Sequence, residues 1–272
     1  MKILKNNILW YTLYGVLITM SFLYLLFPSD IAKSSLEEAV NSSGFILKTG
    51  SLKPSLPFGL KMKKITLSSG PAENPYFQGD VLDVQFNPLN FFKKSKTVKL
   101  SGKAYGGNFS GRFKTASSRI YPPQGGNLRF ENIDLGKYTF LKALLGKEIT
   151  GKAKGSWSYG SHNPAGGNIA GTIALFLNKG TYPLAEPFLG LNRIDFDGGE
   201  IQARLENGTI RIEKLQISGQ QINCFLNGDI LLADEFKNSQ LNLKGEMVIS
   251  DRKVKMNITI EGTLANPALR YI

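Results

Sequence analysis

The sequence predicts a mainly β protein: an N-terminal transmembrane helix followed by an elongated, curved antiparallel β-sheet, a half-open barrel or groove, with a few short helices. Three observations predict this class. An uncharged, mostly apolar run of twenty residues extends from Ile8 to Phe27. Alternating apolar and polar residues then recur every 8–12 residues or so, which is typical of strands in an all-β protein. Few helical stretches separate them, so neighbouring strands should be antiparallel and follow one another as a meander.

The apolar run is long enough for a membrane anchor. At about 1.5 Å per residue, a helix of this length covers the ~30 Å hydrocarbon layer. Lys2 and Lys5 make a basic start, which a cleaved signal peptide would also have. The run exceeds the ~7–15 residues of a signal core, and no Ala-x-Ala-like site follows, so an uncleaved anchor is favoured. Its principal side chains are Ile8, Leu9, Trp10, Leu17, Ile18, Phe22, Leu25 and Phe27.

The charges flanking the run set its orientation. Lys2, Lys5 and the amino terminus precede it, whereas no cluster of basic residues follows it. The positive-inside rule then places the N-terminus in the cytoplasm. We therefore expect residues 1–28 to be a cytoplasmic stub and anchor in the inner membrane, and residues 29–272 to be a periplasmic β domain.

The positive charge is concentrated in the first half of that domain. Residues 29–155 hold 20 Lys and Arg against 9 Asp and Glu, whereas residues 156–272 hold 11 against 12. A basic surface near a membrane is attracted to anionic headgroups, and salt screens the attraction beyond about a Debye length. Nucleic acid is not an expected partner, because the domain is exported and carries no recognition motif. Cys224 is the only cysteine, so no intramolecular disulfide can form.

Three short helices and an edge strand are predicted in the first half. A helix over residues 29–40 either lies on the membrane or packs under the β domain. Pro54 and Pro57 lack amide protons, which suits a bend or an edge strand. An Asn-Pro start predicts a second helix over residues 88–92. Apolar spacing predicts a third over residues 135–145, ending at Gly146.

The second half contains two Asn-Gly pairs, and we expect both to form hairpins. Asn-Gly supplies the two positive φ angles of a type I′ turn. Around Asn207-Gly208 this register opposes Leu205 with Ile210, which places apolar residues on one face. Asn227-Gly228 is expected to repeat the scheme.

About 14 strands at ~4.8 Å spacing would form a sheet roughly 70 Å across, which must curl, split or close. Pro and Gly bends favour an open sheet over a closed barrel. Around Asn227 apolar residues fall on both faces of the predicted strands, so one face is core and the other is covered or forms a groove. The candidate groove residues are Phe225, Leu226, Ile230 and Leu232.

The sequence contains no catalytic constellation, and we expect neither an enzyme nor a cofactor. The only histidine, His162, lies in a predicted loop. One His and one Cys exclude a typical zinc site. Asp195 and Asp197 share one face of a strand, as acid–base pairs or calcium ligands would, but such strand carboxylates are more often solvated.

Several stretches resemble known envelope proteins. The anchor, the short helix and the sequence GFILKTGSLKPSLPFGLK (44–61) resemble the start of the type II secretion system protein N (GspN) family. That opening and the ending IEGTLANPALR (260–270) are also similar to AsmA-like envelope proteins. The resemblance implies an inner-membrane, periplasm-facing accessory of type II protein secretion. AsmA-like relatives are associated with lipid movement along an apolar β-groove.

Two functions follow as expectations. The first is an accessory of type II secretion that acts by protein–protein interaction, with other secretion components as partners. The alternative is an AsmA-like module that binds or transfers phospholipid in an apolar β-groove.

Overall fold

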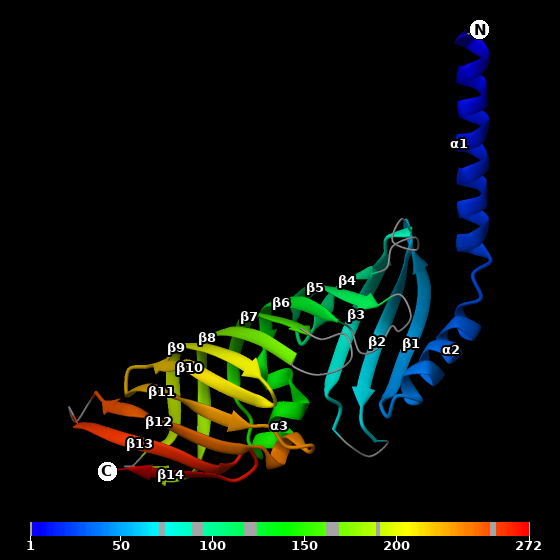
Figure 1. The fold of residues 1–272 in the computed structure, drawn as a ribbon. Helices are drawn as coiled ribbons and strands as arrows, with labels where there is room; N and C mark the ends of the chain where they lie inside the picture. The colour runs from blue at the N-terminus through cyan, green and yellow to red at the C-terminus, as the bar shows by residue number, and fades with distance from the viewer. Residues whose placement is uncertain are drawn as a thin grey trace.

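The computed structural model describes residues 2–70, 74–88, 95–116, 124–161, 169–188, 191–250 and 254–271. Two N-terminal helices, α1 (Lys2–Leu25) and α2 (Ser29–Asn41), precede the strands (Figure 1). A 3-10 helix (Leu135–Lys137) and α3 (Thr139–Leu145) lie between β6 and β7. The strands are β1 (Ile46–Ser55), β2 (Gly59–Ser68), β3 (Phe77–Phe86), β4 (Ser95–Ala104), β5 (Gly107–Ala116), β6 (Gly125–Asp134), β7 (Thr150–Ser161), β8 (Ile169–Phe188), β9 (Leu191–Glu206), β10 (Thr209–Ser218), β11 (Ile222–Leu231), β12 (Gln240–Ile249), β13 (Val254–Thr263) and β14 (Pro267–Tyr271).

All fourteen strands belong to one open sheet. They are ordered β1 to β14 without a crossover, and every neighbouring pair is antiparallel. Figure 1 shows the sheet curving from β1, beside α2, to β14 at the other end. The predicted mainly β class, the curved antiparallel meander and the open edges are therefore confirmed.

The predicted N-terminal helix is present as α1, which extends away from the sheet in Figure 1. Its apolar side chains are largely exposed, from Ile8 to Leu25. In the part of the chain that the structure describes, no helix combines the length and the apolarity needed to span a membrane. The helix itself is thus confirmed, and the predicted crossing of a membrane is not. Phe27 follows the end of α1 and packs against the cluster of Leu52, Met62 and Ile65.

Helix α2 packs against β1 and covers the first edge of the sheet. Its Leu36 side chain contacts the cluster formed around Leu52. The backbone N–H of Thr49 donates to Glu37 Oε1 (2.7 Å), and that of Leu47 donates to Asn41 Oδ1 (3.1 Å). An uncovered edge strand presents such donors to other chains. Of the two predicted positions for this helix, packing on the β domain is therefore correct.

The two Asn-Gly pairs fold differently. Asn207 and Gly208 have φ angles of 49° and 78° and connect β9 to β10, with Leu205 opposite Ile210, as predicted. The second predicted hairpin is wrong, because β11 continues straight through Asn227-Gly228. A Cβ at Gly228 would collide with the carbonyl oxygen of Asn242, so this glycine permits close approach of β12.

The predicted helix over residues 135–145 is broken into two pieces. The 3-10 helix ends at Lys137, Tyr138 has non-helical φ and ψ angles of −83° and 88°, and α3 follows. Gly146 ends α3 with a φ of 64°, as predicted. Most of the helix predicted over residues 88–92 lies outside the described residues.

The apolar core is thickest in the C-terminal half of the sheet. The first part of β9 contributes Leu191 and Ile194, which pack against the buried side chains of Ile222, Leu226 and Met247. A second cluster joins Ala203 of β9 to Leu243 of β12. The long strands β8 and β9 therefore cover the apolar face of the strands that follow them.

Candidate functional site

The sheet has one apolar and one polar face through its central strands. Directly opposed residues of antiparallel strands share a face. One such row crosses β4 to β9 at Leu100, Gly111, Leu128, Trp157, Ile173 and Ala203. A second row crosses the same strands at Gly102, Phe109, Phe130, Gly155, Leu175 and Ile201. The rows are separated by one residue of opposite orientation, so both lie on the apolar face.

This apolar face is only half-buried in the middle of the sheet. Ala203, in the C-terminal core, is buried, whereas the apolar side chains of the same rows on β4 to β8 remain partly exposed. So do Phe113 and Tyr159, which belong to a third row on this face. We call these partly exposed side chains the apolar floor. Its members are Leu100, Phe109, Phe113, Leu128, Phe130, Trp157, Tyr159, Ile173 and Leu175.

On the floor, aromatic rings pack over glycines on the neighbouring strand. Phe109 lies directly opposite Gly102, and its ring would be 2.7 Å from a Cβ placed on that glycine. Phe130 is opposite Gly155 in the same way, at 2.9 Å. Real Cβ atoms do not approach other atoms this closely, so each ring occupies the space that a side chain would need. The aromatic rings thus cover the backbone of the neighbouring strand.

An aromatic cluster closes the end of the floor beside α3. The Tyr105 and Tyr138 rings are 5.0 Å apart, and Tyr138 donates a hydrogen bond to the carbonyl oxygen of Tyr76. Burial raises the pKa of Tyr105 to about 12, although its hydroxyl oxygen accepts a hydrogen bond from the backbone N–H of Gln78, which acts in the opposite direction. Burial also raises the pKa of Tyr138. Both phenols are therefore uncharged at neutral pH, which suits an apolar surface.

The residues predicted to line a groove lie elsewhere and do not share a face. Leu226 is 3% exposed and belongs to the C-terminal core, and Ile230 packs against that core. Phe225 lies on the opposite face and is 43% exposed. Leu232 follows the end of β11 and is half-buried. The structure therefore does not bring the four together, and the partly exposed apolar surface is on β4 to β8.

Alternating residues on two strands are a signal for the floor that the sequence contains. Phe109 and Phe113 alternate with polar residues on β5, and Leu128 and Phe130 do so on β6. The residues opposite them on the next strand are often glycines, which carry no hydrophobic side chain. Those positions therefore do not show an apolar pattern in the sequence. Which residues oppose each other depends on register, and register appears only in the folded sheet.

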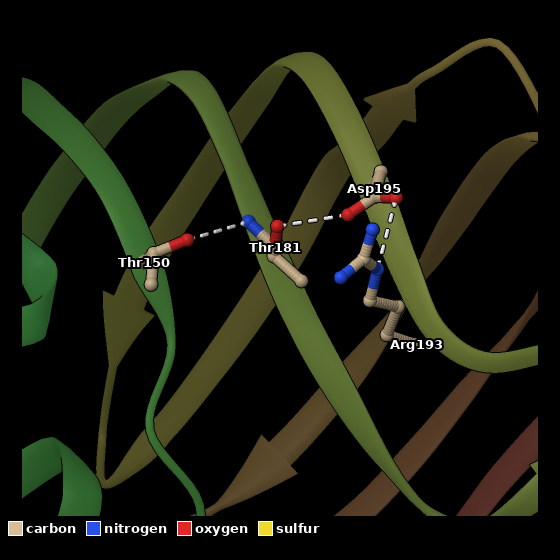
Figure 2. A network of polar contacts seen from close by, with 4 residues as sticks. All are labelled: Thr150, Thr181, Arg193 and Asp195. Carbon is tan, nitrogen blue, oxygen red and sulfur yellow. Dashed lines mark hydrogen bonds and ion pairs between the residues drawn. The ribbon is translucent and has the colours of Figure 1, made fainter.

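The two strand carboxylates take part in a polar network rather than a paired site (Figure 2). Asp195 Oδ1 accepts a hydrogen bond from Thr181 Oγ1 (2.8 Å), and its Oδ2 pairs with Arg193 Nε (3.2 Å). The Thr181 N–H donates to Thr150 Oγ1 (3.0 Å), which ties β7, β8 and β9 together. Asp197 is exposed. Within the described residues no group of three His, Cys, Asp or Glu side chains could hold a metal ion.

The remaining candidates for chemistry are a cysteine and a histidine. Cys224 is buried in the C-terminal core, and desolvation raises the pKa of its thiol to about 11. The neutral thiol therefore predominates at neutral pH, and the thiolate is the reactive form. His162 lies outside the described residues.

The fold and this surface define a class: an open antiparallel β-sheet that curls over an apolar core in its C-terminal half and leaves one apolar face partly exposed on its central strands. No protein-family model, curated protein sequence or solved structure matches the chain.

Proposed function

We propose that this protein is a lipid-binding module that holds acyl chains on the apolar floor of β4 to β8. The observation that carries the proposal is the half-buried state of apolar side chains in register across five neighbouring strands. A ligand that covers apolar surface stabilises the complex by roughly 25 cal/mol for each Å² removed from water. Sustained apolar patches on a protein surface are typical of interaction sites. An acyl chain has the chemistry and the elongated form to lie along such a surface.

Replacing Leu175 by Asp is expected to lower the amount of bound phospholipid at least about fivefold, because a carboxylate on the floor must stay hydrated. The measurement is phospholipid per protein, by native mass spectrometry of the full chain purified gently in detergent. The matched control is Ala174→Asp, which places the same charge one residue away on the polar face. Equal phospholipid in both variants and the unmodified protein, with all three folded, would exclude the floor as the site.

We also propose that α1 attaches the module to the inner membrane, with residues 29–272 on the periplasmic side. The exposed apolar side chains of α1 support this attachment, and the charges before the helix support the orientation. Replacing Leu17 and Ile18 together by Arg should move most of the protein from the membrane pellet to the soluble fraction. Ile31→Arg, a change at an exposed apolar residue of α2, should leave it in the pellet. A double variant that stays in the pellet after a carbonate wash would refute attachment by α1.

A second candidate function is that of an accessory in type II protein secretion, acting by protein–protein interaction. Two observations favour it: the resemblance to the GspN family, and the last edge of the sheet. All five residues of β14 are exposed, whereas α2 covers the first edge. Exposed strand edges accept strands from other chains. Crosslinking from Cys introduced at Leu269 in the native envelope tests this function, and the absence of any crosslinked secretion component would count against it.

A further inference from the structure

Two adjoining hollows lie in the N-terminal half of the sheet, one on its polar face and one at the end of its strands. One, of about 590 Å³, lies over β4 to β7, and the other, of about 600 Å³, lies beside it at the end of β3. They share Gln85, Lys99 and Arg112, so a single ligand can reach both. Volumes of this order are typical of small-molecule sites.

Three cationic side chains gather in the first hollow. Lys99 lies directly opposite Arg112, and Arg129 is opposite Ser110, two residues from Arg112 along β5. Directly opposed residues have Cβ atoms ~5 Å apart, and diagonal neighbours are ~7–8 Å apart. Like charges at these distances repel and destabilise the sheet. A bound anion would relieve this repulsion.

The described residues do not supply that anion. None of these three cations makes an ion pair or a hydrogen bond within the described part of the chain. Two carboxylates lie nearby on this face: Glu131 is two residues from Arg129 along β6, and Asp83 accepts a hydrogen bond from Ser55 Oγ at 2.6 Å. Neither forms an ion pair with the three cations. Farther along the sheet, cations are paired across strands, as in Arg204 with Glu213 (2.6 Å). Other pairs of this kind are Arg211–Asp229, Lys214–Glu200, Lys255–Glu246 and Arg270–Glu261.

The other lining residues define the rest of the ligand. Ser101, Ser110 and Ser156 add hydroxyl groups to the cationic hollow. The adjoining hollow is lined by Phe58 and Phe86, which are 47% and 39% exposed, together with two prolines. One end of the double hollow therefore suits an anion with several acceptor oxygens, and the other suits an apolar group.

We infer that this double hollow binds a phosphate-bearing amphiphile. Its phosphate lies among Lys99, Arg112 and Arg129, and its apolar part rests against Phe58 and Phe86. Guanidinium groups pair with phosphate oxygens in a bidentate manner, and such charge-assisted hydrogen bonds are the strong ones. The source of the phosphate is either a lipid headgroup or a free phosphate ester. The three cations are on the face opposite the apolar floor, so the phosphate end does not depend on the proposed function. Phe86, at the end of β3, is in register with Val98 and Phe113 on the floor's own face, so the apolar end adjoins the edge of the floor.

The test is calorimetric titration of the full chain in a non-ionic detergent. The probes are inorganic phosphate, dibutanoyl phosphatidic acid, and dibutanoyl glycerol, which lacks the phosphate. Phosphatidic acid is expected to bind, and Arg112→Gln should weaken it at least about tenfold, because one charge-assisted contact is lost. The control Lys244→Gln removes one exposed charge from β12 and should leave the affinity unchanged.

The probes also distinguish a lipid headgroup from a free phosphate ester, and binding at the double hollow from binding on the apolar floor. Tighter binding of phosphatidic acid than of inorganic phosphate, with the difference removed by Phe58→Ser, supports a lipid headgroup. Equal binding of both phosphates, still weakened by Arg112→Gln, supports a free phosphate ester. Leu175→Asp on the apolar floor should not alter either affinity. Unaltered affinity in Arg112→Gln, or equal binding of the glycerol without phosphate, would overturn the inference.

Discussion

Leu226→Asp is expected to destabilise the protein by about 4 kcal/mol or more. Leu226 is 3% exposed and packs among Ile222, Met247 and Ile258. Removing a buried leucine side chain costs ~2–5 kcal/mol, and a carboxylate in its place adds the cost of burial without a partner. The free energy of unfolding of a globular domain is ~5–15 kcal/mol, so this one change removes a large part of the stability.

Thermal unfolding followed by circular dichroism measures this effect. A loss of this size lowers the melting temperature by about 10 °C in a chain of this length. The control is Phe225→Asp, at the neighbouring residue on the opposite face, which is 43% exposed. It should shift the midpoint by only a few degrees, because surface substitutions usually change stability by ~0.5 kcal/mol. Similar losses in the two variants would contradict the assignment of faces on β11.

Gly102→Ala is expected to cost about 2–3 kcal/mol, although it adds a single methyl group. The new Cβ would collide with the carbonyl oxygen of Val81 on β3 and lie 2.7 Å from Cζ of Phe109 on β5. The phenyl ring can rotate away, but the carbonyl belongs to the strand backbone, so β3 and β4 must separate. Overpacking of this kind typically costs ~1–3 kcal/mol.

The matched control for this change is Gly160→Ala, also in a strand. A Cβ at Gly160 meets no atom within 4 Å, so no clash is expected there. The midpoint of chemical denaturation should fall for Gly102→Ala and stay constant or rise slightly for Gly160→Ala, since alanine restricts the unfolded chain. A Gly102→Ala protein as stable as the parent would show that Phe109 and β3 do not constrain this position.

Local patterns in the sequence predicted the elements, and tertiary register decided the site. Alternation and turn residues were sufficient for the mainly β class, the meander and the Asn207-Gly208 hairpin. The same dipeptide at Asn227-Gly228 lies within a strand, because long-range pairing with β10 and β12 outweighs the local turn preference. The predicted groove failed for a related reason. Leu226 and Phe225 both looked apolar, and only the folded sheet shows which is buried.

The apolar floor could not have been predicted from single strands. Gly102 and Phe109 are both ordinary strand residues until β4 and β5 pair and place the ring over the glycine. Likewise, the excess positive charge of the N-terminal half was visible in the sequence. Its concentration around Lys99 and Arg112 depends on two strands that happen to place like charges opposite each other.

The uninterrupted order of the fourteen strands has a consequence for how this architecture can change in size. Each strand is bonded only to its sequence neighbours, so a whole hairpin can be inserted or removed in the middle without rerouting the chain. Two strands add ~9.6 Å, and both ends keep their own partners. The length of the protein from α2 to β14 is therefore a sum over its strands. Gene duplication can change it in steps of one hairpin.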